Sequence, residues 1–110
     1  MKTTSLTALA ASQLEAARTA SAGRAAVTVY GGHEHDLRQT LIALRAGTRL
    51  GEHESPDEAT IQVLEGEVTL HAGGDAHDLV AGDHGVIPPE RHDLEARTDA
   101  VVLLTVATRA

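Results

Sequence analysis

The sequence contains no cysteine and almost no aromatic residues. Without cysteine, disulfides and thiolate metal sites are excluded, so any metal must be held by imidazole, carboxylate or water. One Tyr and no Phe or Trp leave no aromatic surface for stacking nucleic-acid bases. The net charge of −7 also argues against nucleic-acid binding, which needs a basic patch that displaces counterions. No apolar run reaches the length of a membrane span or a signal-peptide core, so we expect a cytoplasmic protein.

The chain has 110 residues, which fits one domain with a single core. Residues 5–22 are rich in Ala and predict one helix or two short ones. A capping box is expected at Ser12 and Glu15, and a left-handed C-cap at Gly23. We therefore divide the chain into an N-terminal helical segment, residues 1–24, and a β-barrel, residues 25–110. Ala and Arg are frequent whereas Lys occurs once, a composition that indicates a bacterial source.

After Gly23, β-branched runs alternate with turns rich in Gly and Pro. Many short strands at regular spacing indicate an all-β sandwich or barrel. The expected strands span residues 26–30, 37–45, 60–64, 67–71, 77–79, 85–87, 92–95 and 101–107.

Two segments carry glycines, a proline and histidines at ordered spacing. The first runs from Gly47 through His53 to Gly66, and the second from Gly82 to His92. Together they resemble the two signature motifs of the cupins, and the resemblance covers roughly residues 37–107. It implies an all-β fold, a single jelly-roll β-barrel, here with a short N-terminal helix.

The resemblance also implies a ligand pocket formed by His53, Ser55, Ala59 and His92. Cupins usually hold a metal with three imidazoles and one carboxylate inside the barrel. In this sequence Ser55 stands at the position of the second histidine, and Ala59 at that of the carboxylate. The second motif is also one residue shorter than usual between Pro88 and His92. The metal ligands that remain are His53 and His92.

Two imidazoles are fewer than the three protein ligands usual in a catalytic metal site. We consider His84 or His35 as a third metal ligand, and Asp57 or Glu58 as a replacement carboxylate. With such a ligand the barrel would hold a divalent metal, Zn, Fe, Mn or Ni. Without it, His53 and His92 line a polar pocket.

Two functions follow. In the first, a small cupin binds a small molecule in its barrel with a lost or weakened metal site. In the second, it is a metalloenzyme of the dioxygenase or isomerase type that uses His53 and His92 with a non-standard third ligand. The sequence identifies no catalytic residue and does not decide whether the protein is an enzyme. We expect no nucleic-acid or membrane partner, and a homodimer, because a sheet this small gains by covering an exposed edge.

Overall fold

The computed structural model describes residues 1–54 and 58–108, which form one helix and eight strands. In chain order the elements are α1 (Leu6–Thr19), β1 (Arg24–Tyr30), β2 (Leu37–Leu44), β3 (Glu58–Glu65), β4 (Glu67–Ala72), β5 (Asp75–Val80), β6 (His84–Val86), β7 (His92–Ala96) and β8 (Ala100–Ala107). The all-β class, with one short N-terminal helix, is confirmed. Each expected strand is present within two residues of its expected bounds.

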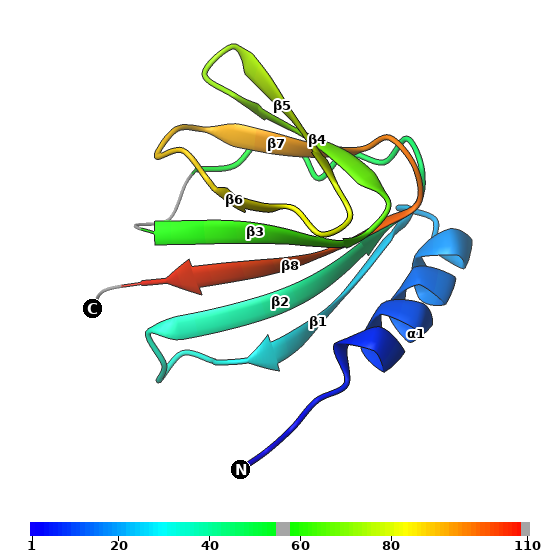
Figure 1. Cartoon of the computed structure of the whole chain (residues 1–110), viewed down its shortest axis with the longest axis vertical. Coiled ribbons are helices and arrows are strands. Elements are labelled where there is room, and N and C mark those ends of the chain that lie inside the picture. Colours follow the sequence, from blue (N-terminus) through cyan, green and yellow to red (C-terminus); the bar gives the residue numbers. More distant parts are fainter. Residues whose placement is uncertain (55–57, 109–110) are drawn as a thin grey trace.

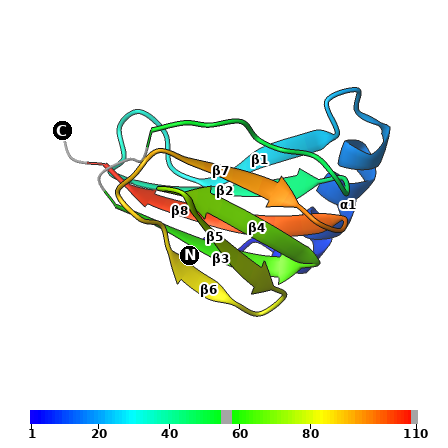
Figure 2. The ribbon, with the colours of Figure 1, turned by 90° about the horizontal axis from the view of Figure 1, so that it is seen from above.

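The strands form two antiparallel sheets that lie one above the other (Figures 1 and 2). The larger sheet has the order β1-β2-β8-β3-β6, and the smaller one has the order β5-β4-β7. Because the chain crosses repeatedly between the sheets, strands far apart in sequence become neighbours, as β2 and β8 do from Leu37–Ala107 to Leu44–Ala100. This is the jelly-roll arrangement expected from the sequence.

Alternation along the strands produces the core between the two sheets. In β3, Ala59, Ile61 and Val63 are buried, while Gln62 between them is exposed. Side chains two residues apart on a strand share a face, so each such strand contributes one face to the core. The opposing sheet supplies Val68 and Leu70 among others. The core is therefore aliphatic throughout.

Helix α1 packs on the outer face of the larger sheet of its own chain (Figure 1). Its buried residues Ala10, Leu14 and Ala17 lie against a second apolar cluster that includes Leu41 and Val101. Both faces are consequently buried over the last residues of β2 and the first residues of β8. Helix α1, the single helix of the described residues, lacks the length and apolar character needed to cross a membrane.

The expected helix signals were placed wrongly. The N-cap is Ser5, whose Oγ accepts a hydrogen bond from the Ala8 N–H at 3.1 Å, and the expected capping box at Ser12 lies inside the helix. There the Ser12 hydroxyl donates to the Leu9 carbonyl instead. The helix ends at Thr19 with Ala20 as its C-cap. Gly23 does have a positive φ of 72°, but it serves the turn into β1.

Candidate functional site

The segment that joins β2 to β3 lies along β7 and extends the smaller sheet. Backbone hydrogen bonds join Gly47 N–H to the Ala96 carbonyl at 2.8 Å and Leu50 N–H to the Leu94 carbonyl at 3.0 Å. At the far end, His53 and His92 exchange both backbone hydrogen bonds, at 3.0 and 3.1 Å. This pairing places the two histidines opposite each other, although their numbers in the sequence differ by 39.

The imidazole rings of His53 and His92 are in direct contact. Their centroids are 4.3 Å apart and the ring planes meet at 71°, an edge-to-face arrangement. His92 is only 4 % exposed, whereas His53 belongs to the exposed residues. One ring is thus part of the barrel wall, and the other lies at its opening.

Backbone carbonyls fix the protonation of both rings. Nδ1 of His53 lies 2.9 Å from the Gly51 carbonyl oxygen, and Nδ1 of His92 lies 3.0 Å from the Glu90 carbonyl oxygen. A carbonyl oxygen only accepts, so each Nδ1 carries the proton and donates it. In the neutral rings, Nε2 then holds a free lone pair. Neither Nε2 has a hydrogen-bond partner in the part of the chain that the structure describes.

Asp93 holds the His53 segment against β7. Its carboxylate accepts one hydrogen bond from the Gly51 N–H and another from Arg49 Nε, each at 2.8 Å. Gly51 has φ +91°, which favours glycine, and its N–H and carbonyl serve Asp93 and His53 respectively. The sequence analysis did not identify Asp93. Its position directly after His92 was the only signal available.

Below the two rings lies an aliphatic pocket of about 290 Å³, measured out to its open mouth. Its closed part is narrow and leaves about 20 Å³ for the centres of water-sized spheres. Apart from His53 and His92, the described residues that form its walls are all aliphatic: Ile42, Leu50, Ile61, Leu70, Ile87, Leu94, Val102 and Leu104. The site therefore combines two unpartnered nitrogen acceptors with a small apolar cavity.

The other expected site residues lie elsewhere or are not described. Ser55 and Asp57 fall outside the described residues, and Ala59 is buried in the core, where its methyl group offers no metal donor. The edge strand β6 turns Gly85 toward Leu79 and Ile61, so the exposed His84 and Val86 face outward. His84 is therefore not beside the two rings.

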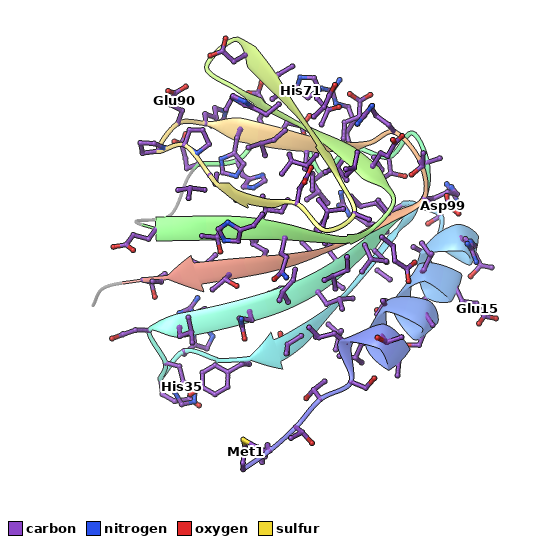
Figure 3. The ribbon with its side chains drawn as sticks, in the orientation of Figure 1. Met1, Glu15, His35, His71, Glu90 and Asp99 are labelled. Atoms are coloured by element: carbon purple, nitrogen blue, oxygen red, sulfur yellow. The ribbon has the colours of Figure 1, made fainter. Side chains whose placement is uncertain are left out.

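The second candidate ligand, His35, lies in the turn between β1 and β2, away from the smaller sheet (Figure 3). Its ring stacks on Tyr30 with centroids 5.2 Å apart, and its Nε2 is 3.6 Å from the Glu34 carboxylate. It does not line the pocket of His53 and His92.

The outer face of the smaller sheet carries paired charges. His71 contacts Glu95 at 3.0 Å, and Figure 3 shows His71 on the side away from the larger sheet.

Arg91, next to His92, binds Glu52 and Glu54. These hydrogen bonds raise the pKa of Arg91 above its ordinary value and keep its guanidinium occupied. Two of the three guanidinium nitrogens of Arg91, Nε and Nη1, are thus bound to glutamates.

With this fold and site established, comparison identifies the class of protein. The chain matches the Cupin domain family over residues 40–107, well over half its length. The protein therefore belongs to the cupin family. No curated protein matches the sequence.

Solved structures show the same fold. A conserved protein of unknown function from Streptococcus pyogenes is 24% identical with a TM-score of 0.73, covering 83% of this chain and 79% of that one. An RmlC-like cupin protein from Desulfovibrio desulfuricans is 27% identical with a TM-score of 0.67, covering 76% and 81%. A salicylate 1,2-dioxygenase from Pseudaminobacter salicylatoxidans is 22% identical with a TM-score of 0.75. The match covers 91% of this chain but only 33% of the dioxygenase, about a third of its length.

The metal that many cupins bind does not fit the donors present here. Residues 1–54 and 58–108 contain no group of three or more His, Cys, Asp or Glu side chains that could hold a metal ion. The described residues offer two imidazoles, and Ala59 takes the position of the carboxylate.

Proposed function

We propose that this cupin binds a small, largely apolar molecule in its barrel, with a hydrogen-bond donor of the ligand on His53 and His92. One observation carries the proposal: the Nε2 atoms of two contacting imidazoles lack partners at the mouth of an aliphatic pocket. Ligand pockets are commonly apolar with a few polar groups that orient the ligand. A hydroxyl group would donate to Nε2, while the carbon chain would contact the aliphatic walls.

The size of the pocket limits the ligand. The pocket leaves about 20 Å³ for the centres of water-sized spheres, so without movement of its walls it admits only one small group, such as the end of an alkyl chain. With no Phe or Trp in the chain, its walls offer aliphatic contacts and no ring stacking apart from the two histidines. A short alkyl chain with one polar end fits these properties.

Hexan-1-ol, titrated into ¹⁵N-labelled protein and followed by amide chemical shifts, tests the proposal. We expect saturable shifts at residues that line the pocket, such as Ile61 and Val102. The double variant His53→Ala/His92→Ala should weaken binding about fivefold, because it removes both acceptors available to the single hydroxyl and so one hydrogen bond of about 1 kcal/mol. His84→Ala, a histidine that faces outward, should leave the affinity unchanged. Shifts scattered over the surface, or equal affinities in all variants, would refute the proposal.

A second candidate function is a metalloenzyme of the dioxygenase or isomerase type. What supports it is the hydrogen bond from each Nδ1 to a carbonyl, because metal-binding histidines are commonly oriented in this way. His53 and His92 would be its ligands, and a third would have to be added to them. This candidate predicts that the protein binds metal stoichiometrically and that the metal is lost when His53 is replaced. A binding pocket without a metal predicts neither result.

We further propose that the protein is a homodimer. A broad, mostly apolar hollow lies between the N-terminal arm and the ends of β1 and β2, and Tyr30 and Leu37 are exposed in it at 47% and 44%. A second copy would cover this surface. Light scattering should give twice the chain mass, and Leu37→Glu should halve it. A monomeric wild-type protein would refute this proposal.

A further inference from the structure

Arg38 is the one arginine of the described residues whose side chain has no partner. Its Nε is buried and makes no hydrogen bond, and none of its guanidinium nitrogens takes part in an ion pair. The remaining described arginines each bind a carboxylate or a backbone carbonyl: Arg18, Arg24, Arg45, Arg49, Arg91 and Arg97.

A buried donor without an acceptor is unfavourable, and more so when it belongs to a charged group. Folded proteins rarely leave such atoms unpaired, so an exception calls for an explanation. In the adjoining turn, the Glu34 carboxylate is directed to His35 at 3.6 Å and makes no ion pair with Arg38. The described residues therefore supply no acceptor to this guanidinium.

Arg38 lies in a hollow of about 460 Å³ that is open to solvent. Hydroxyl groups from Thr28, Tyr30 and Thr40 line it, together with His33, and no acidic residue is among its described walls. The β1–β2 turn also supports the side chain. Gly31 has φ +110°, and a Cβ added there would lie 3.1 Å from Arg38 Cγ, so this glycine lets the turn pack against the stem of Arg38.

This hollow lies on the same sheet face as the histidine pocket. In β2, Arg38, Thr40 and Ile42 alternate onto the inner face, and Ile42 lines the pocket below His53 and His92. Thr40 pairs with Leu104 of β8, which also lines that pocket. Arg38 is thus four residues from Ile42 along one strand, a distance that its long side chain partly spans.

We propose that Arg38 binds the carboxylate of a small organic acid. The planar guanidinium matches a carboxylate with two parallel hydrogen bonds, and the Thr28 and Thr40 hydroxyls would donate to the same group. The carbon chain of the acid would extend along β2 toward Ile42. This extension rests on the proposed function of the histidine pocket, whereas the carboxylate site rests on Arg38 alone.

The test uses the Nε–Hε resonance of Arg38, which reports directly on the unpartnered atom. Labelled protein is titrated with sodium acetate, sodium hexanoate and inorganic phosphate, each at constant ionic strength. Acetate and hexanoate should both move this resonance to saturation. Arg38→Gln should weaken hexanoate binding, followed at the Thr28 and Thr40 amides, about tenfold or more. Arg38→Lys keeps the charge and the stem but loses the planar fork, and it should also weaken binding.

Arg97→Gln is the matched control, since it removes the same charge from a residue that pairs with Asp78 on the other sheet. It should leave hexanoate binding unchanged. Equal losses in Arg38→Gln and Arg97→Gln, a stationary Arg38 resonance, or a stronger response to phosphate than to acetate would overturn the proposal. A response of Arg38 to acetate without any response of the histidine pocket to hexan-1-ol would support the Arg38 site and refute only the proposed pocket.

Discussion

His53 and His92 face each other across two backbone hydrogen bonds, and their imidazoles meet edge to face with centroids 4.3 Å apart. This contact joins the segment before β3 to the start of β7, so it closes one side of the barrel. Both rings donate from Nδ1 to carbonyls close by in the sequence. Local hydrogen bonds thus orient the two rings, and the pairing of the two distant segments brings them together.

The neutral forms of His53 and His92 should both carry their proton on Nδ1. The Gly51 and Glu90 carbonyls accept from these nitrogens, which leaves Nε2 unprotonated. Two-bond ¹H–¹⁵N correlation spectra recorded above the histidine titration range distinguish the two nitrogens. The exposed His84, which has no such carbonyl partner, serves as the reference. A proton on Nε2 of either neutral ring would contradict the description of the site.

Asp93→Ala should destabilise the fold and release the His53 segment. It removes the acceptor of two hydrogen bonds, from Gly51 N–H and Arg49 Nε, and leaves the former without a partner. We expect a loss of about 2–3 kcal/mol in the free energy of unfolding, measured with urea. Glu52→Ala breaks an exposed ion pair with Arg91 and should cost less than about 1 kcal/mol. Similar costs for both variants would show that Asp93 does not anchor the segment.

Asp99 makes the stability depend on pH in the acid range. The Ala46 N–H and then the Arg18 guanidinium stabilise its carboxylate and lower its pKa below the ordinary value. Because the folded pKa is the lower one, this stabilisation is complete above the unfolded pKa, about 3.9, and is lost as the pH falls through the folded pKa.

Asp99→Asn should therefore reduce the free energy of unfolding at pH 7 by about 0.5–1 kcal/mol, a modest value because the side chain is one-third exposed. The difference from the wild type should shrink as the pH falls below that range. Asp75→Asn, at an exposed position of β5, is the control and should change little. An effect of Asp99→Asn that is independent of pH would contradict the assignment.

Two serines of the N-terminal segment should respond differently to replacement by alanine. Ser5→Ala removes the N-cap of α1 and should cost about 1 kcal/mol of stability. Ser12→Ala lies within the helix, where alanine has the higher helix propensity, and should be neutral or slightly stabilising. Urea unfolding of both variants measures the difference. A larger cost at Ser12 would favour the capping box expected from the sequence.

Most of the fold could be predicted from the sequence because its signals are local. Turns at Gly and Pro positions separate the strands, and alternation within them marks the buried face. The spacing of glycines around His53 and His92 resembled the cupin motifs, and the family is confirmed over residues 40–107. The start of the helical segment at residue 5 agrees with the structure, whereas the capping box expected at Ser12 was wrong, because Ser12 lies inside α1 and donates to the Leu9 carbonyl.

The details of the site were harder to predict from the sequence, because they depend on contacts between distant segments. Asp93 anchors residues more than forty positions away, and no spacing rule connects it to Gly51. Arg38 differs from the other arginines only in lacking a partner, which a sequence does not record. Conversely, His84 and His35 are suitable ligand types, but the edge of β6 and the β1–β2 turn place them apart from the pocket.

In our proposal the barrel of this cupin is a binding pocket with two free imidazole acceptors, rather than a metal centre. Elemental analysis of protein purified untagged and without added metal, alongside His53→Ala, tests it most directly. We predict far less than one equivalent of Zn, Fe, Mn or Ni in both proteins, because the described residues supply two metal ligands. One equivalent of metal in the wild type that is lost in His53→Ala would contradict the claim and establish a metal site.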